Sequence, residues 1–218
     1  MTADDANTRG REGDIHPDLM VVILAGGEGR RMGGGKPLRR VDGRTLISLA
    51  LDKARTWSPR VAVAVRSCDQ VGAVNVPVIL DAEGACGPLG GLATALAFAS
   101  RATASRLLTL PCDMPSLPDD LAGRLCEALV PGVGAATAAC AGQLHPICSA
   151  WDVGVQAELR AYTASGGSSV RGFAQAVGAR RIEWDSRTAA AFENLNTPAE
   201  LLFGRAETRR GEPWERDF

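Results

Sequence analysis

A glycine-rich, basic segment near the N-terminus has the composition of a loop that binds phosphates. It runs from Leu24 to Pro37 and reads LAGGEGRRMGGGKP, in which six of 14 residues are glycine. Glycine lets the backbone approach a ligand closely and turn its N–H groups onto phosphate oxygens. Six cations stand in or just after this segment: Arg30, Arg31, Lys36, Arg39, Arg40 and Arg44. Because a triphosphate carries several negative charges, we expect these cations to neutralise it.

Two common nucleotide-binding motifs do not fit this segment. The Gly-x-x-x-x-Gly-Lys phosphate loop needs glycine where the chain has Arg30, and Ser or Thr where it has Pro37. The Gly-x-Gly-x-x-Gly fingerprint of dinucleotide-binding folds fails at Met32. The second mismatch disfavours a nicotinamide-dependent oxidoreductase.

A second candidate group is the carboxylate of Asp113, which lies in the turn PCDMP directly after the apolar run 107–110. Proline fixes φ and restricts the residue before it, so prolines at 111 and 115 make this turn stiff. Mg²⁺ takes few protein oxygens and fills its shell with phosphate oxygens, so one rigid carboxylate suits it. The alternative is an aspartate that only satisfies its own turn.

Asp81 is a second carboxylate at the end of an apolar run, PVIL. It precedes the glycine-rich stretch 84–91, which opens an alanine-rich helix whose N-terminus offers free N–H donors. We expect a base or a ribose to lie against this wall, with Asp81 accepting from sugar hydroxyls or ring N–H groups. The alternative is a residue that serves only the turn before the helix.

Short apolar runs alternate with helical patterns and would position these loops. We expect strands at 19–24, 61–65, 76–80, 107–110, 135–140 and 146–150. We expect helices at 45–57, 92–102, 119–129 (with acidic residues in its first turn) and 153–163, and a last one from the capping box at 197–200. This alternation predicts a mostly parallel sheet with helices on both faces and ligands beyond the carboxyl ends of its strands. We place one domain at 18–205, between a disordered tail at 1–17 and a charged tail at 206–218.

Composition narrows the classes of function. A net charge of −1 excludes a broadly basic nucleic-acid binder. Six cysteines without a Cys-x-x-Cys pair, and only two histidines, argue against a zinc site. Cys112 and Cys148 fall in apolar runs and are expected in the core, as in a reducing compartment. The polar, acidic N-terminus is no signal peptide, and no apolar run approaches the roughly 20 residues that span a bilayer. We expect a cytoplasmic protein without nucleic-acid or membrane partners.

Taken together, these motifs resemble the signature of the molybdenum cofactor guanylyltransferases of the nucleotidyltransferase superfamily. LAGG-x-x-RRMGG followed by Lys36 is similar to the family's nucleotide-binding loop. GPLGG at 87–91, PCDMP at 111–115, HP at 145–146 and NLNTP at 194–198 follow in the family's order, so the match covers about residues 20–203. The resemblance implies an α/β fold, a three-layer αβα sandwich with a mostly parallel, Rossmann-like sheet, as in the nucleotide-diphospho-sugar transferases.

The resemblance also implies a reaction and its site. The family transfers GMP from GTP to molybdenum-molybdopterin, giving the guanine dinucleotide cofactor and pyrophosphate, with Mg²⁺. Catalysis would fall to Lys36, Arg31 and Asp113, and Asp113 would hold the metal ion. The binding residues would be Leu24, Ala25, Gly26, Gly27, Lys36, Asp81, Gly87, Pro88, Leu89, Asp113, Asn194 and Asn196.

Of these residues, Asn194 and Asn196 would line the pterin or metal side of the pocket, unless they only form the turn before the last helix. His145 would stabilise the site rather than transfer protons. The implied partners are the two small-molecule substrates, with transient contacts to enzymes that donate molybdopterin or accept the product.

Two departures from the family pattern leave alternatives open. Gly35 stands where the family has an acidic residue before the lysine, and the strand 61–65 ends without the family's polar base-reading residue. The second departure keeps a molybdopterin cytidylyltransferase that uses CTP as an alternative. A non-catalytic nucleotide-binding regulator is an alternative of another class, which Lys36 and Asp113 disfavour.

Overall fold

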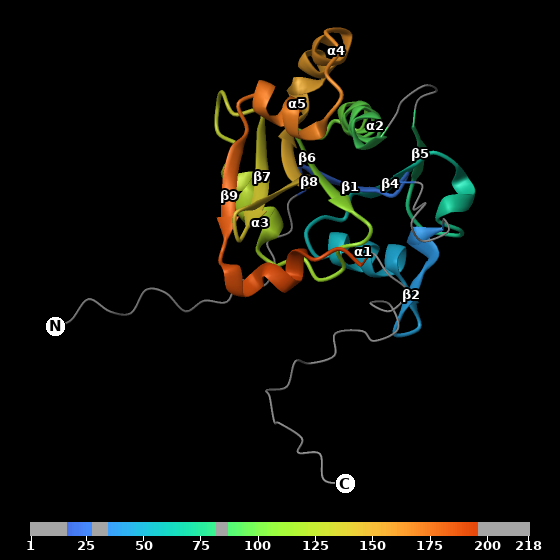
Figure 1. Cartoon of the computed structure of the whole chain (residues 1–218). Helices are drawn as coiled ribbons and strands as arrows, with labels where there is room; N and C mark the ends of the chain where they lie inside the picture. The colour runs from blue at the N-terminus through green and yellow to red at the C-terminus, as the bar shows by residue number, and fades with distance from the viewer. Residues whose placement is uncertain (1–16, 28–34, 82–86, 196–218) are drawn as a thin grey trace, which may run out of the picture.

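A seven-stranded sheet forms the centre of the protein in a computed structural model that describes residues 17–27, 35–81 and 87–195. Its strand order is β5-β4-β1-β6-β8-β7-β9 (Figure 1). The strands are β1 (Leu19–Leu24), β4 (Val61–Val65), β5 (Val78–Leu80), β6 (Arg106–Pro111), β7 (Ala135–Cys140), β8 (Gln143–Asp152) and β9 (Arg180–Trp184). The remaining two, β2 (Arg40–Val41) and β3 (Arg44–Thr45), form a separate small hairpin.

All neighbours in the large sheet are parallel except where β8 is involved, because β8 runs antiparallel to both β6 and β7. A two-residue turn joins β7 to β8, with Ala141 at φ 49° and Gly142 at φ 80°. Two positive φ angles give a turn of the type I′ geometry, which reverses the chain and forces an antiparallel pair. The prediction of a mostly parallel α/β sheet is confirmed, with β8 as the exception.

Two helical layers cover the faces of this sheet (Figure 1). Along β1, Leu19, Val21 and Ile23 join one core, whereas Met20 and Val22 join the other. This alternation follows from the two-residue period of a strand buried on both faces. The first core contains α1 (Leu46–Arg55) and α3 (Leu121–Glu127), and the second contains α2 (Gly87–Arg101), α4 (Gln156–Ala164) and α5 (Val170–Ala176). The predicted three-layer αβα sandwich is therefore confirmed.

Short 3₁₀ helices complete the described chain: η2 (Lys36–Leu38), η3 (Cys68–Gln70), η4 (Val153–Val155) and η5 (Ser186–Phe192). Capping explains several boundaries. Thr45 starts α1 by accepting the N–H of Ser48 at 3.2 Å, and Asp185 starts η5 by accepting that of Arg187 at 2.8 Å.

Some expected elements differ from the structure. The helix expected at 119–129 begins at Leu121 and has no acidic residue in its first turn. Its two aspartates serve tertiary contacts instead, since Asp119 pairs with Lys53 and Asp120 accepts the indole N–H of Trp184 at 2.9 Å. The alanine-rich helix starts at 87 rather than 92, so the GPLGG motif forms its first turns. The sequence did not predict β9, α5 or the β2–β3 hairpin.

Three sequence predictions lie outside the described residues: the capping box at 197–200, the charged tail at 206–218 and, apart from Pro17, the tail at 1–17. The prediction that two cysteines lie in the core is confirmed. Cys112 and Cys148 are both buried, and burial raises the pKa of the Cys112 thiol to about 12. That thiol therefore stays protonated and packs as a small apolar group.

Candidate active site

The candidate active site lies where the parallel strands β5, β4, β1 and β6 end. The chain leaves β1 toward β4 and β5 on one side, then crosses through α2 to β6 on the other. Ligands of open α/β sheets bind at such a reversal, beyond the carboxyl ends of the strands. The predicted residues Asp81 and Asp113 follow β5 and β6, so they flank the end of β1 from opposite sides.

A cavity of about 450 Å³ opens on the α2 side of these strand ends. This volume is within the range of small-molecule sites in proteins. Its walls are Leu24, Gly26, Gly27, Ala64, Arg66, Asp81, Gly87, Pro88, Gly91 and Ile147. Six of the predicted binding residues thus lie together around one cavity: Leu24, Gly26, Gly27, Asp81, Gly87 and Pro88.

Asp81 is the acidic group of this cavity. Its backbone N–H donates to Val65 at 2.8 Å, which fixes the residue to the end of β4. Its Oδ1 is buried without a hydrogen-bond partner among the described residues. Burial raises the pKa of the Asp81 carboxyl, and the charge of Arg66 opposes the rise. A buried acceptor that lacks a donor costs free energy, so this oxygen is suited to receive a donor from a ligand.

Gly26 leaves little space for a side chain beside this carboxylate. A Cβ on Gly26 would lie 3.0 Å from Oδ2 of Asp81 and 3.4 Å from two atoms of Arg66. A Cβ on Gly91 would make only ordinary van der Waals contacts, with Leu24 at 3.5 Å and with Oδ1 of Asp81 at 3.7 Å. Glycine at position 26 therefore lets the loop after β1 approach Asp81 closely.

Arg66 is a cavity residue that the sequence analysis missed. It comes directly after β4, so the strand 61–65 does end at a polar side chain, which lines the cavity with Asp81. The signal that could have found it was its place directly after a strand, as Asp81 comes directly after β5. The cavity consequently contains a cation that does not come from the glycine-rich loop.

Lys36 and Asp113 form an ion pair with Nζ 2.5 Å from Oδ2, although 77 residues separate them. Their side chains are only 16% and 15% exposed, so the pair is largely screened from water. The register places it next to the cavity, because Leu24 pairs with Pro111, two residues before Asp113. A cation and a carboxylate thus stand together at the carboxyl end of β6, beside the strand that contributes Leu24 to the cavity.

The site fits Mg²⁺ only as an ion shared with a substrate. The described residues contain no cluster of three or more His, Cys, Asp or Glu side chains that could hold a metal ion. Mg²⁺ is usually bound by one or two carboxylates together with substrate phosphates. Asp113, on its stiff turn, matches that requirement.

Several predicted residues lie elsewhere. Ala25 and Leu89 are each buried in one of the two cores. The backbone N–H of Ala25 donates to the carbonyl of Ala64 at 2.8 Å. Asn194 is exposed, in the segment that follows η5. Arg31 and Asn196 lie outside the described residues.

The cluster of six cations expected at the triphosphate is only partly supported. Arg40 donates to the carbonyl of Gly43 within the β2–β3 hairpin, and Arg44 pairs with Asp52 of α1. Only the Arg40 contact lies within the hairpin, where the chain turns back at Asp42 and Gly43, which have φ 51° and 78°. Of the cations in the described part of this segment, only Lys36 pairs with Asp113.

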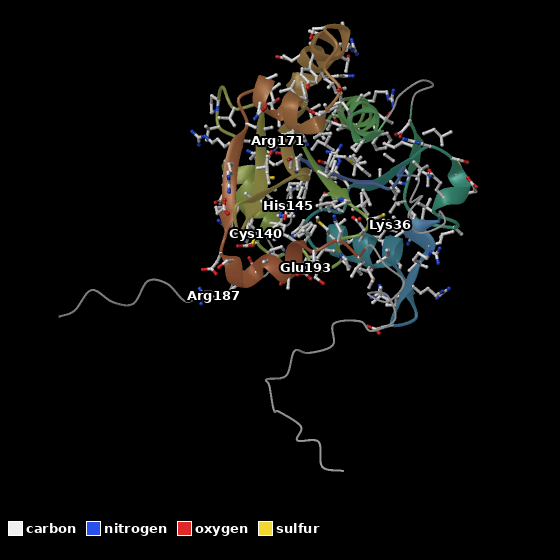
Figure 2. All side chains as sticks on the ribbon, viewed as in Figure 1. Lys36, Cys140, His145, Arg171, Arg187 and Glu193 are labelled. Carbon is white, nitrogen blue, oxygen red and sulfur yellow. The ribbon has the colours of Figure 1, made fainter. Side chains whose placement is uncertain are left out.

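His145 lies on β8 and is 7% exposed. Its ring stacks on Phe192, with centroids 4.9 Å apart and an interplanar angle of 28°. Burial lowers the pKa of His145, so the ring is neutral near pH 7. Figure 2 labels His145, together with Cys140 of β7 and Glu193, the residue after η5. The buried, neutral ring packs against Phe192, as expected for a histidine with a structural role.

Comparisons with known proteins agree on one family. The model of the MobA-like NTP transferase domain matches residues 21–180. A molybdenum cofactor guanylyltransferase of Cereibacter sphaeroides is 39% identical, with 87% of this chain and 96% of that protein covered. One of Rhodopseudomonas palustris is 37% identical, with 85% and 90% covered.

Solved structures share the fold. Molybdopterin-guanine dinucleotide biosynthesis protein A of Archaeoglobus fulgidus superposes with a TM-score of 0.68 at 20% identity, covering 84% of this chain and 94% of that one. A CMP:2-keto-3-deoxy-manno-octonic acid synthetase complexed with CTP gives 0.65 at 16% identity, covering 83% and 94%. Within its described part, the chain has no helix with the length and apolar character of a membrane span.

Proposed function

Because the chain belongs to the MobA-like NTP transferase family, we propose that it is a molybdenum cofactor guanylyltransferase. It transfers GMP from GTP to molybdenum-molybdopterin and releases pyrophosphate. The observation that carries this proposal is the Lys36–Asp113 pair beside a nucleotide-sized cavity at the strand ends. The relatives that carry this name are similar over nearly their whole length, which supports the same activity here.

The reaction joins two phosphates. A terminal phosphate oxygen of molybdopterin attacks the α-phosphorus of GTP, a new P–O bond forms, and the bond to the bridging oxygen of pyrophosphate breaks. Since the nucleophile is already anionic, a strong general base is unnecessary. Catalysis then depends on alignment and on stabilisation of the charge that develops on pyrophosphate.

Lys36 supplies the charge stabilisation in this mechanism. Its ammonium group, paired with Asp113 in the structure, donates to phosphate oxygens when the nucleotide is bound. The N–H groups of the glycine-rich loop and Arg31 add to this effect. Asp113 would hold Mg²⁺, which would supply positive charge that offsets the negative charge of the phosphates. The stiff Pro111–Pro115 turn keeps the carboxylate in place.

Asp81 and Arg66 select the base and the sugar. Guanine presents adjacent N–H donors on one edge, and the buried Oδ1 of Asp81 lacks such a donor. Gly87, Pro88 and Gly91, from the start of α2, also line the cavity. Leu24 and Ile147 add apolar surface against which a base can pack. A carboxylate acceptor in this position supports GTP over CTP.

The remaining assignments follow from this activity. Enzymes that supply molybdopterin or accept the dinucleotide are transient partners. We place the reaction in the cytoplasm, because the five cysteines in the described ranges are free thiols, as a reducing compartment keeps them. Asn194 faces solvent next to the Asp113 loop, where it can meet the pterin substrate.

The test is pyrophosphate release by the purified protein with Mg²⁺ and molybdopterin, comparing GTP, CTP and ATP. We expect release with GTP, and a rate with CTP lower by at least about 10-fold, the scale of one discriminating hydrogen bond. Release with CTP alone would assign the chain to cytidylyl transfer. Binding of GTP without release would make it a nucleotide-binding regulator and refute the proposed function.

A further inference from the structure

A short segment formed by the last residue of η5 and the three residues after it contacts both the aspartate turn and the first residue of α1. We propose that residues 192–195, which we call the clasp, are a positioning element that keeps Asp113 aligned with Lys36. The proposal rests on the proposed function, because it takes Asp113 as the working carboxylate. Phe192 and Leu195 of the clasp act through the aspartate turn and the helix that the clasp contacts.

The first contact of the clasp is with the aspartate turn. The backbone N–H of Leu195 donates to the carbonyl of Asp113 at 3.0 Å. This bond fixes the peptide from which the Asp113 side chain extends. From beneath, the turn is held by Met114, whose Sδ lies 3.6 Å from Sγ of Cys148 on β8. The clasp thus adds a restraint on the turn to the one that Met114 provides in the core.

The second contact is with the lysine side of the pair. The side chain of Leu195 packs against Leu46, the fully buried first residue of α1. The N–H of Leu46 donates to Arg39 at 2.8 Å, and the N–H of Arg39 donates to Lys36 at 3.1 Å. Leu195 is therefore in direct contact with Asp113. It is also linked to Lys36 through Leu46 and the two hydrogen bonds just described.

The clasp is anchored in an aromatic cluster at its other end. Phe192 is 4% exposed, stacks on His145 at 4.9 Å, and tilts against Trp184 at 5.6 Å between centroids. Trp184 is fixed in turn by its N–H bond to Asp120. These residues belong to β8, β9 and the start of α3, the half of the sheet away from Lys36.

The link between the anchor and the contacts is short. Only Glu193 and Asn194 separate Phe192 from Leu195, and both are exposed. Three extended residues span at most about 10 Å. Because this link is short, a displacement of Phe192 should also displace Leu195. Misplacement of a catalytic group by about 1 Å can lower a rate by about 100-fold. The position of Phe192 in the core therefore affects the alignment of Asp113.

A purely structural role for Phe192 is the competing interpretation, and the chain offers a matched control for it. Phe173 of α5 is also fully buried and stacked, on Trp151 at 5.6 Å. It lies in the other core, on the opposite face of the sheet from Phe192. Phe192→Leu and Phe173→Leu each remove one aromatic stack, but only the first change reaches the clasp.

The experiment measures Mn²⁺ binding and Mg²⁺-dependent turnover for both variants, with thermal unfolding alongside. Mn²⁺ serves as a spectroscopic probe by electron paramagnetic resonance, with GTP present and molybdopterin omitted. We expect Phe192→Leu to weaken Mn²⁺ binding by about 5-fold and to lower kcat by about 10-fold. Phe173→Leu should lose a similar amount of Tm and keep wild-type Mn²⁺ binding.

Leu195→Ala tests the same clasp without removing a core side chain, so it remains informative if Phe192→Leu does not fold. It keeps the N–H bond to Asp113 and removes the packing on Leu46. We expect a loss in kcat of about 3- to 10-fold. Leu195→Met should restore most of the rate, because it refills the contact with Leu46.

Asp113→Ala is the benchmark that separates the two proposals. If it changes neither Mn²⁺ binding nor turnover, the proposed role of Asp113 is wrong. If Asp113→Ala removes both, while Phe192→Leu and Phe173→Leu behave alike in metal binding and kcat, the clasp proposal alone is overturned. Wild-type values for Leu195→Ala would overturn it as well.

Discussion

Asp113 and Asp81 are two carboxylates at the ends of parallel strands of one sheet, and the fold treats them in opposite ways. Asp113 is paired with Lys36 at 2.5 Å, stands between two prolines, and accepts the N–H of Leu195 at its carbonyl. Asp81 is partly buried, has one oxygen without a donor among the described residues, and has a raised pKa. The protein satisfies the first carboxylate, and we propose that a ligand supplies the missing donor to the second.

This difference between the two carboxylates suits two separate tasks, alignment of the reacting groups and recognition of the base. A group that aligns phosphates and metal must be in place before the substrate arrives, since reorganisation during the reaction would cost rate. A group that recognises a base gains selectivity when the correct ligand supplies the missing donor and a wrong one does not. The paired Asp113 suits the first task and the unsatisfied Asp81 suits the second.

Removing Asp113 should have the largest effect. We expect Asp113→Ala to lower kcat by at least about 100-fold, the scale for one preorganised electrostatic contact. The change also leaves the screened ammonium of Lys36 without this partner, so Tm should fall. Steady-state pyrophosphate release and a thermal melt measure the two effects. Wild-type turnover in this variant would remove Asp113 from the metal role.

Lys36→Met should have a somewhat smaller effect on both binding and rate. Methionine keeps much of the side-chain volume and removes the charge, so nucleotide affinity and kcat should each fall by about 10-fold or more. Isothermal titration with GTP and single-turnover kinetics give the two numbers. Lys53→Met, on the outer part of α1, is the control, because Lys53 pairs with Asp119 away from the cavity. Equal effects of both changes would contradict a phosphate-binding role for Lys36.

Asp81→Asn should change stability in the opposite direction and by the smallest amount. Its raised pKa means that the folded protein carries the charge at a cost near pH 7, and that this cost disappears below the ordinary pKa of 3.8, where the group is protonated in both states. We expect the variant to melt about 1–3 °C higher at pH 7. The gain should shrink as the pH falls toward 4.

The exposed Asp18 provides the matched control for that measurement, because Asp18→Asn makes the same substitution outside the cavity and should leave Tm unchanged at pH 7. A lower Tm for Asp81→Asn at pH 7 would show that the carboxylate is stabilised in the folded state. In that case the contrast between the two carboxylates would be lost.

Strand ends were the part of the site that the sequence could locate. The runs at 19–24, 61–65 and 135–140 match β1, β4 and β7 at both ends, because a continuous apolar run that stops at glycine or a polar residue is typical of a buried strand. Asp81 and Asp113 were therefore placed correctly after β5 and β6. The strand β9, RRIEW, was missed because its exposed arginines interrupt any apolar pattern.

The sequences of the two hairpin turns contain a local signal for a chain reversal that the strand predictions did not include. Asp-Gly at 42–43 and Ala-Gly at 141–142 both have two positive φ angles. Asp-Gly between short strands is among the strongest hairpin signals in a sequence. Its use would have separated Arg40 and Arg44 from the phosphate-binding cations, because both side chains are engaged in or beside that hairpin.

The sequence by itself determined the family, the order of the strands along the chain and the types of chemical group at their ends. These are properties of local pattern, since periodicity, glycine and proline act over a few residues. Tertiary structure decided which groups meet. The bond from Leu195 to Asp113 joins residues 82 positions apart, and the cavity brings Arg66 beside Asp81. Such contacts depend on strand order and on packing between layers, which local pattern does not encode. They decide that Asp113 is paired and that Asp81 keeps an oxygen without a donor among the described residues.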